Sequence, residues 1–344
     1  MKRIGLLCML FLCLFSTQTF AQVDVGNGGK LSGLAFGDYY WMAQNHNKNV
    51  QGDNGFWIRR IYLTYDQKIS DSFSARLRFE MSSPGDFVSD SKMIPDVKDA
   101  YLRWHKNNQQ VLVGISSTPT FGLTEHVWGY RSVEKSPQDL FSYGSSRDFG
   151  IAAKGQLGTS GDLHYHFFFG NGNGNKSEVN KGKKFMLSLS YDLTDHVIAQ
   201  VYGDYNDRPN DVESYTIQGF AAYRSDDLNV GVLYSYQNQT NVFGMQSYDK
   251  NLASVFANFQ ISDKVKGYLR ADHLFDRYLA GPNNSYLPFY YDAKPTFLVG
   301  GIDLRMDENV HLMPNIEAIA YGKDTLGQTP DADLVPRLTL FYKF

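Results

Sequence analysis

The chain has 344 residues, of which 42% are apolar and 20% charged, and its 33 basic residues are nearly balanced by 36 acidic ones. This balance excludes the basic composition typical of nucleic-acid binding, and an aromatic content of 15% argues against a disordered chain. A mean hydropathy of −0.37 argues against a bundle of membrane helices. Abundant Tyr and Phe favour strands, and 31 Gly favour turns between them.

The first 21 residues have the pattern of a secretory signal peptide. Lys2 and Arg3 precede an apolar run over residues 4–15, and residues 19–21 read Thr-Phe-Ala, a small-x-small cleavage site. Both cysteines, Cys8 and Cys13, lie within this segment. We therefore expect an exported protein made of a signal peptide (1–21) and one domain (22–344), without disulfides or thiol ligands.

The rest of the chain alternates apolar and polar residues with a period of two. Residues 73–82, for example, place Phe, Ala, Leu, Phe and Met between Ser, Arg, Arg, Glu and Ser, which is the pattern of a strand with one apolar and one polar face. The pattern predicts sixteen strands, at 31–44, 55–69, 72–83, 97–106, 110–118, 147–158, 161–171, 183–194, 196–206, 213–225, 228–238, 250–262, 265–277, 295–306, 309–321 and 334–344.

The connections alternate between tight turns and longer loops, as an antiparallel barrel with both chain ends on one side requires. Strands of about 10–14 residues can cross a tilted bilayer, whereas strands of soluble sandwiches are usually shorter. Charged residues lie well inside the polar faces, as expected for a water-filled lumen. We predict an all-β transmembrane antiparallel barrel in a Gram-negative outer membrane, with lipid outside.

Sixteen strands enclose an aqueous channel rather than a solid core. The longest loop, 119–146, contains Phe121, Trp128, Tyr130, Phe141 and Tyr143. Because exposed aromatic side chains are unfavourable, we expect this loop to fold into the lumen as a constriction. Its polar residues would then face water; they are Glu125, His126, Arg131, Glu134 and Lys135. Packing over the mouth or against another subunit is the alternative.

Four stretches resemble the phosphate-selective porin O and P family in its Bacteroidetes form. They are Phe-Trp-Ile-Arg-Arg-Ile-Tyr-Leu at 56–63, the hairpin at 71–80, Val-Lys-Asp-Ala-Tyr-Leu at 97–102, and the residues around the long loop at 119–123, 134–135 and 147–150. The resemblance implies a trimeric porin that conducts small anions, phosphate among them. The terminal Phe344 is similar to the signal that the barrel-assembly machinery recognises in the last strand.

Strand alternation places Arg60, Arg76, Arg78 and Arg103 on the lumen face, together with Glu80 and Asp99. Arginine suits an anion path because its charge is permanent and its planar group pairs with carboxylate or phosphate oxygens. The alternative is a structural network in which opposite charges on adjacent strands neutralise each other.

The other motifs in the sequence do not indicate a metal site or a phosphate-binding loop. His164 and His166 share one strand face without the further ligands of a metal site, and the Gly-Asn run at 170–175 precedes no predicted helix. We expect no cofactor, no metal and no enzymatic activity. The sequence predicts a channel for passive diffusion of small hydrophilic solutes; a blocked adhesive barrel and an outer-membrane barrel hydrolase are the alternatives.

Overall fold

The computed structural model describes residues 22–85, 87, 92–158, 161–279 and 286–344. The predicted signal peptide, residues 1–21, lies outside the described residues. The strands and helices are β1 (Val23–Gly26), β2 (Gly29–Trp41), β3 (Asn54–Lys68), β4 (Phe73–Ser82), β5 (Ile94–Lys106), β6 (Gln109–Ser117), α1 (Gly122–Trp128), α2 (Pro137–Leu140), β7 (Arg147–Leu157), β8 (Leu163–Gly170), β9 (Lys184–Asp192), β10 (Val197–Arg208), β11 (Val212–Arg224), β12 (Leu228–Val242), β13 (Met245–Ser262), β14 (Val265–Leu274), β15 (Pro295–Asp307), β16 (Val310–Tyr321) and β17 (Asp333–Lys343).

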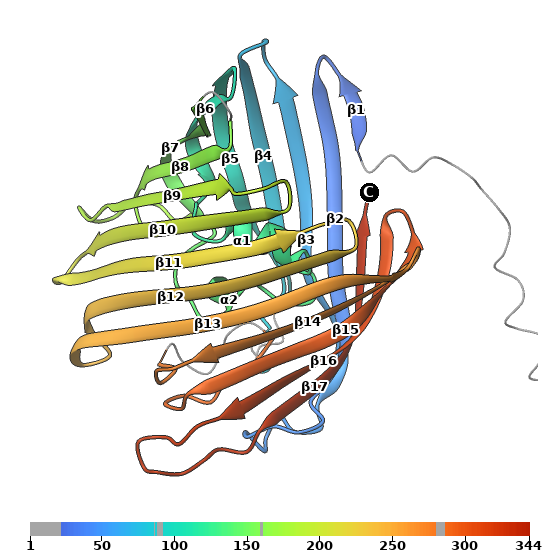
Figure 1. The fold of residues 1–344 in the computed structure, drawn as a ribbon, viewed down its shortest axis with the longest axis vertical. Helices are drawn as coiled ribbons and strands as arrows, with labels where there is room; N and C mark the ends of the chain where they lie inside the picture. Colours follow the sequence, from blue (N-terminus) through green and yellow to red (C-terminus); the bar gives the residue numbers. More distant parts are fainter. Residues whose placement is uncertain (1–21, 86, 88–91, 159–160, 280–285) are drawn as a thin grey trace, which may run out of the picture.

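Strands β2 to β17 form a closed antiparallel barrel (Figure 1). Each strand pairs with its neighbours in the sequence, and β17 pairs with β2 to close the ring. These sixteen strands correspond to the sixteen predicted ones, so the predicted fold class is confirmed. Among the described residues, neither helix is long and apolar enough to cross a membrane.

Two details of the strands differ from the prediction. The four-residue strand β1, which pairs with the start of β2, was not predicted. The predicted loop at 239–249 is instead a tight hairpin, because β12 and β13 extend until Val242 pairs with Met245. Phe243 and Gly244 form this turn with positive φ angles of 54° and 73°, as two-residue hairpins require.

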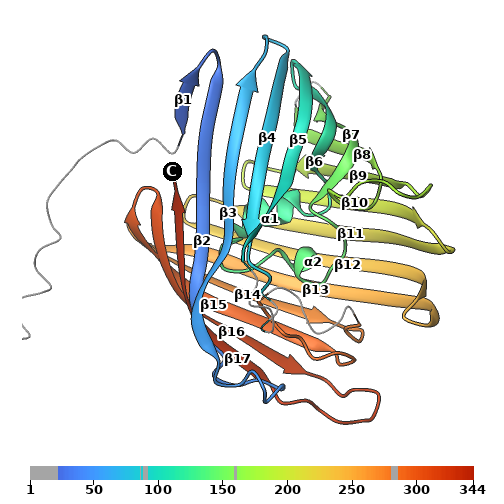
Figure 2. The same cartoon turned by 180° about the vertical axis from the view of Figure 1, so that it is seen from behind.

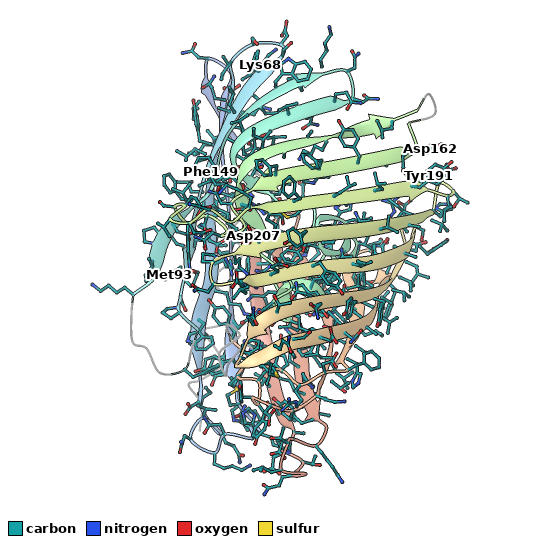
Figure 3. The ribbon with its side chains drawn as sticks, turned by 90° about the vertical axis from the view of Figure 1, so that its left-hand side faces the viewer. Lys68, Met93, Phe149, Asp162, Tyr191 and Asp207 are labelled. Carbon is teal, nitrogen blue, oxygen red and sulfur yellow. The ribbon has the colours of Figure 1, made fainter. Side chains whose placement is uncertain are left out.

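The outer and inner faces of the wall differ in polarity. On β11, Tyr215 and Ile217 are exposed on the outside, whereas Thr216 and Gln218 are buried inside. Figure 3 shows the same outward direction for Phe149 on β7 and Tyr191 on β9. An apolar outside around a polar inside is the arrangement of a membrane barrel.

Two β-bulges add inward charges that strict alternation would not place there. Opposite the step from Phe36 to Gly37, Arg59 is the extra residue of β3, so Arg59 and Arg60 both point inward. Opposite the step from Arg78 to Phe79, Lys98 is the extra residue of β5 and points inward with Asp99. A bulge of this kind redirects side chains locally.

The C-terminal residue completes the closure between β17 and β2. The backbone N–H of Gly33 donates to the carbonyl of Phe344 (2.7 Å), and the N–H of Phe344 donates to the carbonyl of Gly33 (3.0 Å). The ring of Phe344 lies directly over Gly33, so that a Cβ atom at position 33 would overlap it. The lack of a side chain at position 33 therefore lets the last residue seal the barrel.

The substitution Gly33→Val should displace the Phe344 ring and lower the yield of folded barrel in detergent refolding. The yield is measured as the fraction that shows heat-modifiable migration on gels. Gly219→Val is the matched control, because Gly219 also faces outward and has open space around its Cβ position. Equal yields for both variants would contradict a sealing role for Phe344.

Candidate channel and its constriction

Loop 118–146, which connects β6 to β7, folds into the barrel as predicted (Figure 2). It contains both helices, α1 and α2, and α1 packs against the inner faces of β11, β12 and β13. All five aromatic residues that the sequence singled out are at least 94% buried: Phe121, Trp128, Tyr130, Phe141 and Tyr143. Burial of these rings explains why the loop leaves the surface.

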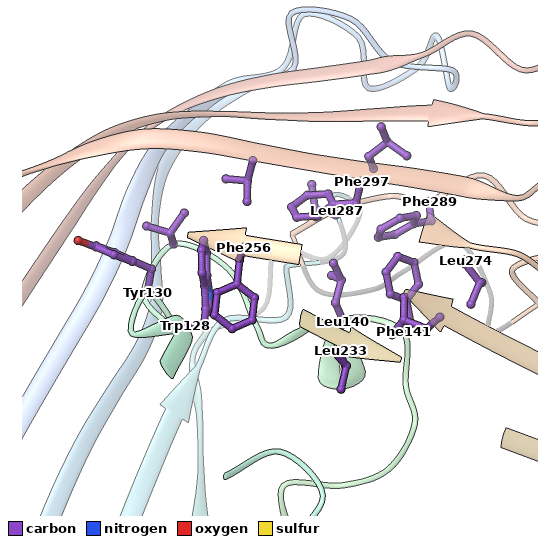
Figure 4. Close-up of a cluster of buried hydrophobic side chains, with 14 of the residues drawn as sticks. Trp128, Tyr130, Leu140, Phe141, Leu233, Phe256, Leu274, Leu287, Phe289 and Phe297 are labelled. Carbon is purple, nitrogen blue, oxygen red and sulfur yellow. The ribbon is translucent and has the colours of Figure 1, made fainter. Parts of the chain in front are cut away.

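Trp128 is fully buried at the centre of this packing (Figure 4). Its ring meets Phe256 of β13 edge to face at 5.5 Å and Tyr268 of β14 at 6.1 Å. The guanidinium of Arg270 lies 5.2 Å from the same ring, a cation–π contact that strengthens in a site with little water. The indole N–H donates to the carbonyl of Glu134 at 3.1 Å.

Polar side chains of the wall hold the backbone of the loop. Lys250 donates from Nζ to the carbonyls of Phe141 and Ser142, both at 3.0 Å, and the hydroxyl of Tyr143 donates to the carbonyl of Lys250 at 2.9 Å. Gln218 donates to the carbonyl of Thr120 at 3.0 Å. Buried backbone carbonyls need such donors, so the loop is fixed at several points along its length.

A second inward segment, described at 275–279 and 286–294, was missed by the sequence analysis. Phe289 is fully buried and packs against Phe141 of the long loop at 5.5 Å (Figure 4). The hydroxyl of Tyr286 donates to the carbonyls of Arg59 (2.9 Å) and Ser83 (3.0 Å). The aromatic residues of this segment could have predicted its inward position, because exposed rings are as unfavourable here as in loop 118–146.

The wall opposite the loop, from β3 to β7, carries a network of ion pairs. Glu80 pairs with Arg60 and, at 2.9 Å, with Lys98. Asp99 pairs with Arg147 and, at 3.3 Å, with Arg78. These acidic groups take up part of the positive charge, but each one is shared between two cations, so the network keeps a net positive charge.

The four predicted arginines all lie on the inner face but differ in their partners. Arg60 and Arg78 belong to the network just described, and Arg76 forms a bidentate pair with Asp66 at 2.7 and 2.9 Å. Arg103 donates to the hydroxyl of Ser74 at 2.9 Å, and the described residues provide no acidic partner for it. Neighbouring acids thus bind three of the four, which agrees with the alternative of a structural network at these positions.

Two cavities flank loop 118–146 and share one lining residue, Arg147. The larger, of about 650 Å³, reaches the tight turns at Asp263 and Glu308. The smaller, of about 360 Å³, reaches the β8–β9 loop at Gly172. Arg147 therefore lies between the two cavities, and the sequence analysis did not include it among its site residues.

The predicted loop residues divide into two groups. Glu125, His126 and Arg131 line the larger cavity. Glu134 is 1% exposed, and its carboxylate accepts from the backbone N–H of Lys135 at 2.7 Å, inside the loop. Lys135 is half-buried, and its carbonyl accepts from Arg270. The structure thus brings three of the five residues to the water path.

Asp139 is a further acidic residue of the loop that lines the larger cavity. Burial would raise the pKa of its carboxyl, but Lys135, Arg131 and Arg60 outweigh burial and hold the pKa below its ordinary value. Burial lowers the pKa of Lys135, and Asp139 opposes that shift. Asp139 therefore stays ionised at neutral pH and faces the positive wall across the water path.

His164 and the Gly-Asn run, two further features of the sequence, have structural partners. His164 bonds to Asp192 at 2.8 Å, and Asp192 also pairs with Arg224 at 2.9 Å. Among the described residues no group of His, Cys, Asp or Glu is arranged to hold a metal ion. In the Gly-Asn run, the backbone N–H of Gly172 donates to Asp148 at 2.7 Å. Asp148 therefore occupies the backbone donor that an anion would need.

Solved structures of outer-membrane proteins match this chain over nearly its whole length. OmpF of Salmonella typhi superposes with a TM-score of 0.67 at 12% identity, over 94% of this chain and 100% of that one. An anion-selective porin from Comamonas acidovorans gives 0.66 at 12%, over 92% and 99%. The channel DcaP of Acinetobacter baumannii gives 0.66 at 12%, over 94% and 100%.

The chain has the sixteen-stranded outer-membrane porin fold. No family model matches the sequence, and a comparison with curated proteins finds no match. In this chain the larger cavity reaches the rim with the turns at Asp263 and Glu308, and the smaller cavity reaches the rim with the β8–β9 loop. The predicted outer-membrane location agrees with this fold.

Replacing Trp128 with Ala should loosen loop 118–146, because loss of a fully buried aromatic ring costs about 3–5 kcal/mol. We expect a folded barrel with a larger mean single-channel conductance and more current noise. The control is Val179→Ala in the β8–β9 loop, where the residue is 86% exposed. A variant that inserts normally with unchanged conductance and noise would show that Trp128 does not hold the loop.

Proposed function

We propose that this protein is an outer-membrane porin through which small hydrophilic solutes diffuse passively. The observation that carries the proposal is the pair of water-accessible cavities on either side of loop 118–146, which meet at Arg147 inside a closed barrel. A barrel with a blocked lumen would need the loop to fill this space. The porins and channels with the same fold support the same conclusion.

We further propose that the channel favours anions. Among the described residues that line the larger cavity, eight are Lys or Arg and five are Asp or Glu. The smaller cavity is lined by Arg147, Lys176, Lys184 and Arg208 against Asp148. Both cavities are therefore positive although the whole chain has a formal charge of −3. Fixed positive charge beside a narrow water column raises the local concentration of anions.

We also propose that phosphate permeates this channel. The likeness to the phosphate-selective porin O and P family suggests phosphate as one permeant anion, which competition between phosphate and chloride currents would test.

OmpT of Vibrio cholerae, with a TM-score of 0.62 at 12% identity over 92% of this chain and 99% of that one, has been described in a trimer form. We propose a trimer here too, to be tested by the mass of the detergent-extracted protein.

Replacing Arg147 with Glu should shift the reversal potential of a salt gradient toward cation selectivity. A unit charge at about 7 Å in water changes an ion's energy by about 0.6 kcal/mol, so this reversal by two units changes it by about 1.2 kcal/mol, or about sevenfold in local ion concentration. The shift should be larger in dilute than in concentrated salt, because screening shortens the reach of the charge. Planar-bilayer recordings in potassium chloride gradients measure it.

Lys48→Glu is the control for this charge reversal, since Lys48 pairs with Asp331 on the exposed loops and is not a lining residue of either cavity. A carboxylate at position 147 would lie beside Asp99 and could impair folding. Arg147→Gln is therefore a second variant, which removes the positive charge and keeps hydrogen-bond donors. Selectivity that is equal in wild type and in a folded Arg147 variant would refute the position of Arg147 on the ion path.

A further inference from the structure

The inner wall of the larger cavity carries an apolar strip that passive diffusion of hydrophilic solutes does not explain. The strip consists of Phe341 on β17, Phe36 and Leu34 on β2, and Tyr62 on β3, all of which line the cavity. Phe341 is paired directly with Phe36, and Leu34 with Tyr62, so the side chains are contiguous across three strands. Water-filled barrels normally present polar side chains at such positions.

Three of the four side chains of this strip remain partly exposed. Leu34, Tyr62 and Phe341 are each partly exposed, whereas Phe36 is 4% exposed. The space against them is the cavity of about 650 Å³, and the loop residues on this cavity include Val127 and Gly129. A volume of this size is within the range of small-molecule sites. The apolar surface is therefore available to a solute.

A positively charged side chain lies at each end of the strip. The Nζ atom of Lys343 lies 5.6 Å from the ring centre of Phe341, and the guanidinium carbon of Arg78 lies 5.7 Å from the ring centre of Tyr62. Lys343 is also the direct strand partner of Leu34. The wall thus offers an apolar surface bounded by positive charge, which is complementary to a molecule with an apolar body and an anionic group.

We propose that this strip is a binding subsite for small amphiphilic anions, namely carboxylates attached to a six-membered hydrocarbon ring or a short alkyl chain. The hydrocarbon part lies on Leu34, Phe341 and Tyr62, and the carboxylate pairs with Arg78 or Lys343. This proposal rests on the proposed channel function, because the solute must first enter the lumen. It adds a preference within the anions: an apolar body increases the residence time.

The test compares two carboxylates that share a six-membered ring and a single charge. Cyclohexanecarboxylate has a hydrocarbon ring, and quinate has the same ring with four hydroxyl groups. Each is titrated into a chloride solution that bathes wild-type channels in a planar bilayer, and block of the chloride current is recorded. Loss of contact equivalent to about two methylene groups is about tenfold in affinity, so cyclohexanecarboxylate should block at about tenfold lower concentration.

Leu34→Thr and Phe341→Thr should each reduce this ratio about threefold or more, because they remove apolar surface while keeping residues that favour strands. The matched controls are Leu187→Thr and Phe185→Thr on β9, whose side chains face outward and are 42% and 50% exposed. They should leave the ratio unchanged. The chloride current of each variant shows that its barrel has assembled.

The outcomes separate the two proposals. Absence of chloride current in correctly folded wild type would refute the channel function itself. Chloride current with equal block by both carboxylates would refute the subsite and leave the channel intact. A tenfold ratio that persists in both strip variants would place the apolar contact elsewhere and also refute it. If neither strip variant assembles, the test rests on the ratio of the blocking concentrations of the two carboxylates in wild type. A ratio near ten supports the proposal, and a ratio near one overturns it.

Discussion

A strand edge in hydrocarbon leaves a row of backbone N–H and C=O groups without partners, and the pairing of β17 with β2 avoids that penalty. Inside the same seam, Asp38 of β2 accepts hydrogen bonds from Thr339 at 2.6 Å and Arg337 at 3.1 Å, and it pairs with Arg59. These side-chain hydrogen bonds and ion pairs on the lumen side thus stabilise the same junction of β17 and β2 that the backbone hydrogen bonds close.

The seam also determines where the inward segments attach. Arg59 donates to the carbonyl of Val133 in loop 118–146, and Arg337 donates to the carbonyl of Tyr286 in the second segment. Buried arginines need several partners to offset the loss of hydration, and the loop carbonyls supply some of them. Closure of the barrel and narrowing of its lumen therefore depend on the same few charged groups.

Strand number, approximate strand ends and inward folding of the aromatic loop could be predicted from the sequence, because period-two alternation and ring burial are local signals. The inward positions of Arg59 and Lys98 could not, since a bulge depends on the register with the partner strand and leaves alternation elsewhere intact. The position of Arg147 between two cavities could not be predicted either, because it depends on contacts between residues far apart in the sequence.

The bulges let β3 and β5 each carry one extra residue without exchanging their inner and outer faces. Trp57 packs inward against Tyr286, while Ile58 is exposed to the outside, and both keep these faces because the bulge takes up Arg59. Deletion of Arg59 would restore strict alternation between Ile58 and Arg60 and leave these faces unchanged, whereas a regular strand that kept Arg59 would turn the indole toward lipid and the isoleucine toward water. Loops absorb insertions and deletions readily, and at these two points the bulges give the barrel wall the same tolerance for one residue.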